Sequence, residues 1–170
     1  MKFYMKLQDW LAGPFSQKMQ KFMQNPYMHA LQVCFTIILP MIMVGSLASL
    51  VNTFRNFAPW LPDLSLINSF SFGLISIFMA FLIPYTIMES KKLQKQKMIT
   101  GFASVSALIA LANPQYVDGN LVINSGYVGT GGMTVAMVMG LVIGWLFSAY
   151  FKHGLFKKDS SLPSVVVVWF

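Results

Sequence analysis

Long apolar runs, each near the length of a membrane-spanning helix, alternate along this chain with short polar segments. The runs at residues 31–51, 66–88 and 133–151 are each long enough to cross a hydrocarbon core of about 30 Å as a helix. A weaker run covers residues 98–112, where small polar residues lower the hydrophobicity, so we expect it to shelter against the other helices. The pattern predicts an all-α polytopic membrane helix bundle with about four transmembrane helices.

The connections between the runs carry their own signals. Pro40 lies in the middle of the first run, where it removes one backbone hydrogen bond and is expected to bend the helix. Asp118-Gly119 separates two short β-prone segments and predicts a hairpin turn. The tract 126–132 contains four glycines and predicts a flexible approach to the last run.

Residues 2–24 precede the first run and predict two short amphipathic helices divided at Gly13-Pro14. An aromatic face opposite lysines is typical of a helix lying in the cytoplasmic headgroup layer, and an arm packed on the rest of the protein is the alternative. We therefore divide the chain into three parts. Residues 1–29 form an amphipathic cytoplasmic or interfacial segment, 30–163 a membrane scaffold, and 164–170 the start of a truncated further element.

Basic residues are distributed unevenly around the predicted spans. Of the twelve, eleven precede the first run, lie between the second and third, or follow the fourth; Arg55 alone lies in another connection. Cytoplasmic loops carry such an excess of lysine, so the N-terminus is predicted to be inside. A net charge of +7 next to membrane-length segments indicates attraction to anionic lipid, and no nucleic-acid role is expected.

Candidate catalytic chemistry is sparse. Cys34 lies inside an apolar run, His29 and His153 lie at membrane edges, and Glu89 borders the lysine-rich loop. We expect no catalytic residue, metal ligand or cofactor, and a packing or boundary role for each of these four. The spans carry no central charge, and no broken helix pair of the kind that transporters use is expected.

A ladder of small residues is the one constellation with a clear physical meaning, and its spacing of four places its members on one face of the last predicted helix. Such a face lets another backbone approach closely. It predicts packing within one bundle or, alternatively, packing between subunits. The ladder consists of Gly132, Ala136, Gly140, Gly144 and Ser148.

Three segments resemble a known family. Leu39–Ser46, with proline at mid-span and Gly45-Ser46 beyond it, resembles the first membrane helix of enzyme IIC from bacterial phosphotransferase systems of the lactose/cellobiose/diacetylchitobiose type. Gly129–Met133 is similar to that family's glycine-rich approach to its fourth helix. Leu162–Val165 resembles the beginning of its Pro-Val-Pro segment, although the second proline is absent here.

The resemblance implies the N-terminal scaffold half of a permease subunit in the bacterial cytoplasmic membrane. In that family the subunit takes up a cellobiose- or lactose-type sugar, and a phosphocysteine on the IIB partner, supplied through IIA, phosphorylates the sugar as it arrives. The scaffold half makes the homodimer contacts, and the sugar-binding residues lie on the C-terminal half. No substrate-binding residue is therefore expected on this chain.

Two other interpretations stay open. In the first, the chain is a stand-alone membrane interaction protein whose four helices assemble with a partner. In the second, it is a nonfunctional truncated fragment of the permease. A continuing reading frame after the Phe170 codon, in any phase, that encodes further membrane helices would support a truncated transporter subunit.

Overall fold

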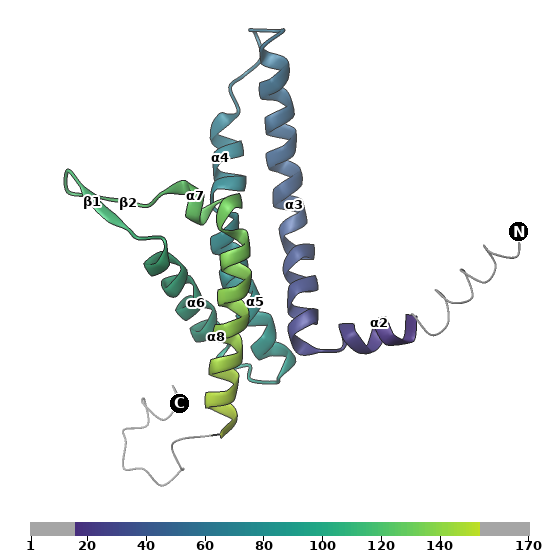
Figure 1. The fold of residues 1–170 in the computed structure, drawn as a ribbon. Helices are drawn as coiled ribbons and strands as arrows, with labels where there is room; N and C mark the ends of the chain where they lie inside the picture. The colour runs from purple at the N-terminus through teal and green to yellow at the C-terminus, as the bar shows by residue number, and fades with distance from the viewer. Residues whose placement is uncertain (1–15, 154–170) are drawn as a thin grey trace, which may run out of the picture.

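The computed structural model describes residues 16–153, and this part of the chain is mostly helical (Figure 1). The elements are α2 (Ser16–Met23), α3 (Pro26–Arg55), α4 (Ser65–Gly73), α5 (Ile75–Ser90), α6 (Lys97–Leu111), β1 (Gln115–Val117), β2 (Asn120–Val122), α7 (Ser125–Val128), the 3-10 helix η2 (Thr130–Gly132) and α8 (Met133–His153). Within these residues, three segments are long and apolar enough to cross a membrane: Pro26–Arg55, Ser65–Ser90 and Thr130–Lys152. The predicted mostly helical fold is confirmed, and these three segments have the length and composition that a membrane crossing requires.

The described chain begins with α2 and turns at Asn25-Pro26 into α3. Asn25 has extended backbone angles, φ −65° and ψ 126°, and its side chain accepts a hydrogen bond from the Tyr27 amide at 3.1 Å. Pro26 follows at the first helical position, where a missing N–H costs nothing. The predicted amphipathic helix before Gly13 and the predicted element at 164–170 lie outside the described residues.

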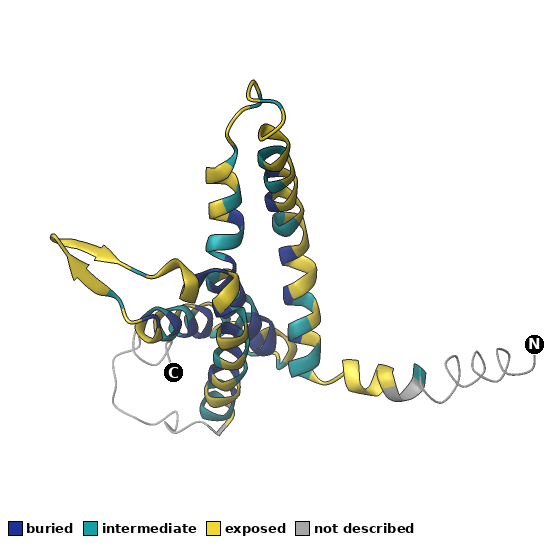
Figure 2. Ribbon diagram, turned by 45° about the horizontal axis from the view of Figure 1, so that its top comes forward, coloured by how far each residue is buried: buried dark blue, intermediate teal, exposed yellow. Residues whose placement is uncertain are grey.

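Helix α3 is continuous from Pro26 through Pro40 to Arg55. Three of its hydroxyl side chains donate to the carbonyl oxygen four residues earlier, at 2.7–2.9 Å, so these groups find partners within the helix, as a lipid environment demands. Its buried residues face α4 and α5, and most of its other side chains are exposed (Figure 2).

The second membrane segment is interrupted at Leu74. The angles of Leu74, φ −119° and ψ 5°, lie outside the helical region, so α4 ends at Gly73 and α5 begins at Ile75. A new set of helical bonds starts there, with the Ile77 amide donating to the Leu74 carbonyl at 3.0 Å. The predicted crossing at residues 66–88 is thus formed by two helices with one non-helical residue between them, a detail that hydrophobicity alone does not report.

Helix α5 forms the centre of the bundle, with α3, α6 and α8 packed on it. Its side chains Met79, Ala80, Ile83 and Ile87 are fully buried, and Figure 2 shows the buried positions concentrated in this part of the molecule. The ends of α3 and α4 that lie farthest from α5 are joined by a loop and carry mostly exposed side chains (Figure 2).

The weak third run, at residues 98–112, forms α6, which has 15 residues. Its small and polar residues Thr100, Gly101 and Ser104 are buried, and α6 packs mainly on α5. The contact is close, since a Cβ atom at Gly101 would lie 2.7 Å from the ring of Phe81. These three residues are therefore sheltered against other helices, as the sequence predicts, whereas Ser106 is exposed.

A two-stranded hairpin extends from the bundle between α6 and α7 (Figure 1). Val117 pairs with Asn120, which leaves Asp118 and Gly119 as the two turn residues. Both have positive φ angles, 50° and 78°, as the favoured two-residue hairpin turn requires. The predicted turn is confirmed.

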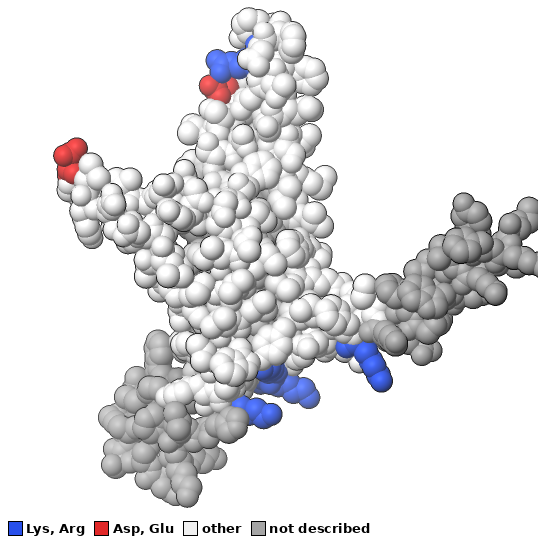
Figure 3. Space-filling view, in the orientation of Figure 1, with Lys and Arg blue, Asp and Glu red and all other residues white. Residues whose placement is uncertain are grey.

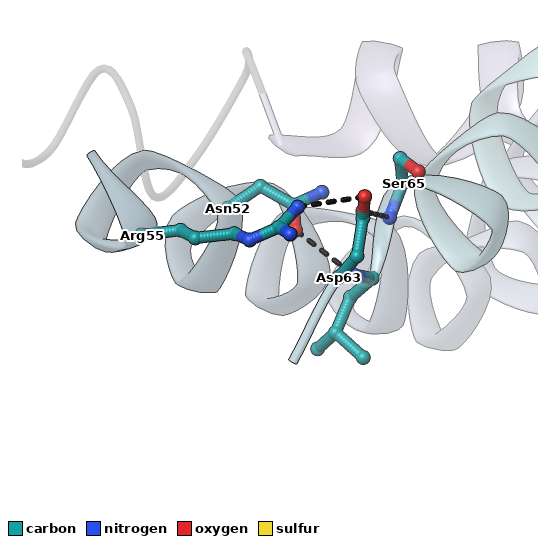
Figure 4. Close-up of polar contacts among 5 residues, drawn as sticks. Asn52, Arg55, Asp63 and Ser65 are labelled. Carbon is teal, nitrogen blue, oxygen red and sulfur yellow. Dashed lines mark hydrogen bonds and ion pairs between the residues drawn. The ribbon is translucent and has the colours of Figure 1, made fainter. Parts of the chain in front are cut away.

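Polar contacts close the loop between α3 and α4 (Figure 4). The Arg55 Nη1 atom lies 2.7 Å from Asp63 Oδ2, and Asp63 Oδ1 accepts a hydrogen bond from the Ser65 amide at 2.9 Å. Asn52 Oδ1 accepts from the Leu64 amide, also at 2.9 Å. These contacts fix the direction in which the chain returns from α3 into α4.

The hydrogen bonds to Asp63 predict a measurable shift of its pKa. Hydrogen bonds from Ser65, followed by that from Arg55, lower the pKa of Asp63 below its ordinary value of 3.8. A lowered pKa stabilises the folded loop above pH 3.8, and this contribution is lost as the pH falls through the folded-state pKa. NMR titration of ¹³C-labelled aspartate, assigned with Asp63→Asn, measures it. Arg55→Gln should raise the pKa only part of the way, because Ser65 remains; an Asp63 pKa of 3.8 or above would contradict the contact.

Candidate functional site

The small residues of the ladder face α5. Gly132, Ala136, Gly140, Gly144 and Ser148 are all buried. A Cβ atom at Gly140 would lie 3.0 Å from Ile83 Cβ, and one at Gly144 would lie 2.6 Å from Ile87 Cδ1. The absence of side chains at these two positions thus lets α8 approach α5 closely. Within the described residues, this face is covered by the chain's own helix.

We call the close contact between α5 and α8 the seam. Beyond one end of this seam, the glycine tract before α8 crosses the break between α4 and α5. The Ser76 hydroxyl donates a short hydrogen bond to the Gly129 carbonyl. A Cβ atom at Gly129 would lie 3.1 Å from the Phe72 carbonyl oxygen and 3.3 Å from Gly73 Cα. The two backbones are therefore in direct contact at the point where the membrane segment is interrupted.

An open cavity of about 380 Å³ lies beside this crossing. Its lining includes Asn68, Ser69 and Phe72 of α4 together with Ser125, Thr130 and Gly131 of the glycine-rich connection. All its lining residues are uncharged, and they offer amide, hydroxyl, backbone and aromatic groups. Such a lining suits an uncharged hydrophilic solute, because hydrogen-bonding groups fix orientation without demanding a charged partner.

Residues of this cavity were not among the candidates that the sequence singled out. Transporters build solute sites at discontinuous membrane helices, and α4–α5 is discontinuous. We expected no broken helix pair of the kind that transporters use; within the described residues, α4–α5 is one such interrupted segment and not a pair. The available signals were Gly73 within an apolar run and the glycine tract, but the sequence alone does not bring the two together.

The remaining candidates lie elsewhere. His29 Nδ1 is 3.3 Å from the Ser90 hydroxyl, Glu89 pairs with Lys97 at 3.0 Å, and Cys34 is buried in α3. None of these lines the cavity. In the part of the chain that the structure describes, no three His, Cys, Asp or Glu side chains gather to hold a metal ion.

No family model, curated protein or solved structure matches this chain. The class of protein is thus defined by the fold: a mostly helical protein with three segments long and apolar enough to span a membrane. The interrupted segment and its uncharged cavity are the features from which a function is argued.

The face of α8 that packs closely on α5 predicts that substitutions on this face and on the exposed face will differ in their effect on stability. Gly140→Leu and Gly144→Leu insert bulk against Ile83 and Ile87, and overpacking of this kind commonly costs about 1–3 kcal/mol. Thermal unfolding in detergent should show this loss. The controls Val138→Leu and Val142→Leu, at exposed positions of the same helix, should change little.

The yield of crosslinked dimer distinguishes the two interpretations of the ladder. Loss of stability is expected, because the face is covered within the chain. Loss of dimer at unchanged stability would instead assign the face to a subunit interface. Glycine variants that behave like the valine controls in both measurements would contradict close packing altogether.

Proposed function

We propose that this chain is the N-terminal membrane scaffold of a permease subunit from a bacterial phosphotransferase system for a cellobiose- or lactose-type sugar. The observation that carries this proposal is the interrupted α4–α5 segment beside an uncharged cavity of about 380 Å³. Irregular backbone at membrane depth is tolerated where it is buried or lines a cavity. A neutral sugar needs hydrogen-bonding and aromatic groups, which this lining offers. The resemblance of Leu39–Ser46 supports the specific family.

Four crossings with a cytoplasmic N-terminus complete the proposal. Lys91 donates hydrogen bonds to Tyr27 of α3 and Ser148 of α8, so the start of α3 and the ends of α5 and α8 meet. The ion pair between Lys97 and Glu89 brings the start of α6 to the same end. Figure 3 displays basic side chains gathered there, with a mostly uncharged surface between them and the pair at the other end of α3. Lysine-rich ends face the cytoplasm.

Helix α6 makes the shortest of these crossings. At about 1.5 Å per residue its 15 residues span about 22 Å, less than the hydrocarbon thickness of about 30 Å. Local thinning of the bilayer accommodates such a helix. Its burial against α5 also keeps Thr100 and Ser104 away from lipid.

In this proposal, the cavity is one wall of the sugar path, and the rest of the subunit supplies the residues that complete the sugar site. The IIB and IIA phosphocarriers meet the lysine-rich cytoplasmic end, and the subunit acts as a homodimer. Phosphoryl transfer requires no residue of this chain.

A stand-alone membrane interaction protein is the second candidate. Met43 and Leu47, one helical turn apart on α3, are more than 60% exposed and would give partner helices an apolar surface. The DNA beyond the Phe170 codon discriminates the two functions. A continuing frame that encodes further membrane helices supports the permease subunit, whereas the lack of such a frame in every phase supports the interaction protein.

The proposed topology predicts which positions an impermeant thiol reagent reaches in intact cells. In a Cys34→Ala background, Asp118→Cys should be labelled from outside, because the hairpin faces away from the lysine-rich end. Lys95→Cys should be labelled only after the cells are opened. Labelling of Lys95→Cys in intact cells would contradict the orientation.

Calorimetry tests whether this chain binds sugar without the rest of the proposed subunit. Tight sites bury about 70–90% of their ligand, whereas this cavity is open, so cellobiose, lactose and chitobiose should give no saturable heat with this chain alone. A micromolar isotherm that Asn68→Ala abolishes and Asn120→Ala preserves would show instead that the cavity is a complete sugar site.

A further inference from the structure

Lys91 is the residue that joins three helices at the lysine-rich end. It follows the last residue of α5, and its Nζ atom donates to Tyr27 Oη at 2.7 Å and to Ser148 Oγ at 2.6 Å. The same atom lies 4.6 Å from the centre of the Tyr27 ring. The Ser148 hydroxyl donates onward to the Trp145 carbonyl at 3.1 Å. The ammonium group is thus fixed in position by neutral partners.

No carboxylate in the described residues balances this charge. Of the three described acids, Glu89 pairs with Lys97, Asp63 pairs with Arg55, and Asp118 lies in the hairpin turn. The carbonyl end of a helix compensates only part of a charge, about half an elementary charge. A second ammonium, that of Lys152, adds to the excess beside Lys91.

These two lysines line one cavity. It has a volume of about 270 Å³, and its lining comprises Lys91, Leu93, Ser148 and Lys152. The volume is below the range of about 300–1,000 Å³ typical of sites for drug-sized ligands, so it suits a small group. Two of the three ammonium protons of Lys91 are bound by hydroxyls, which leaves one for a ligand. The cavity therefore offers a fixed cation and a second lysine in its lining.

We infer that this cavity binds the phosphate group of an anionic membrane lipid. Basic pockets between membrane helices recognise such headgroups, and this one lies between α5 and α8 at the end of both helices. Trp145 and Leu146, in the preceding turn of α8, are about half exposed and offer an apolar surface to the acyl chains. The inference requires a membrane protein but is independent of the proposed sugar transport.

Native mass spectrometry of the purified chain, titrated with phosphatidylglycerol or phosphatidylcholine, tests this site. Phosphatidylglycerol should bind more tightly. Lys91→Gln and Lys152→Gln should each weaken its binding by about tenfold or more, since each removes a charge-assisted contact. Lys95→Gln is the matched control, because it removes the same charge from an exposed position outside the cavity lining.

Three outcomes would overturn the inference. Equal affinity for the two lipids would remove the preference for an anionic headgroup, because both lipids carry a phosphate and only phosphatidylglycerol has a net negative charge. An equal loss of affinity in Lys95→Gln would indicate diffuse electrostatic attraction instead of a site. Displacement of phosphatidylglycerol by equimolar inorganic phosphate or glycerol phosphate would assign the cavity to a free phosphate. Lys152→Gln keeps the test decisive if Lys91→Gln unfolds the chain, because Lys152 is exposed and its removal spares the bonds to Tyr27 and Ser148.

Discussion

Contact between α5 and α8 holds the bundle together, and small residues make it possible. Lipid is as apolar as leucine, so helices in a membrane gain little from burying hydrophobic surface and rely on close packing and hydrogen bonds. Gly140 and Gly144 supply the packing against Ile83 and Ile87. Hydrogen bonds supply the rest, from Ser76 near one end of the seam and from Lys91 to Ser148 at the other.

The two ends of this seam differ in chemistry, and each bears a cavity. At one end, the glycine tract crosses the break in α4–α5 beside an uncharged cavity that suits a neutral solute. At the other end, Lys91 and Lys152 surround a smaller basic cavity that suits a phosphate group. The packing of α8 on α5 therefore positions a candidate transport site and a candidate lipid site at opposite ends of the seam.

Features set by local sequence were predictable. Asp118-Gly119 specifies its own turn, and the small polar residues of α6 indicate a sheltered helix. The interruption at Leu74 was not predictable, because it accompanies a contact with Gly129, which is far away in the sequence. A hydropathy profile averages over many residues and therefore does not show such a break.

The other features could not be predicted because they depend on which residues meet in the folded protein. The ladder of small residues was visible in the sequence, but its spacing identifies only a close-contact face and not the helix that occupies it. Likewise, the lysines indicated orientation, but nothing in their spacing paired Lys91 with Tyr27 and Ser148. The cavities depend on such pairings, so they emerge only from the fold.

Disulfide crosslinking within the membrane tests the central contact most directly. A Cβ atom at Gly140 would lie 3.0 Å from Ile83 Cβ, near the range of about 3.5–4.5 Å between Cβ atoms in disulfides. In a Cys34→Ala background, the pair Ile83→Cys and Gly140→Cys should oxidise to an intrachain disulfide that runs as a monomer. The pair Ile83→Cys and Val138→Cys, with Val138 exposed, should not. A crosslink that forms only between chains, or equally in both pairs, would contradict the packing of α8 on α5.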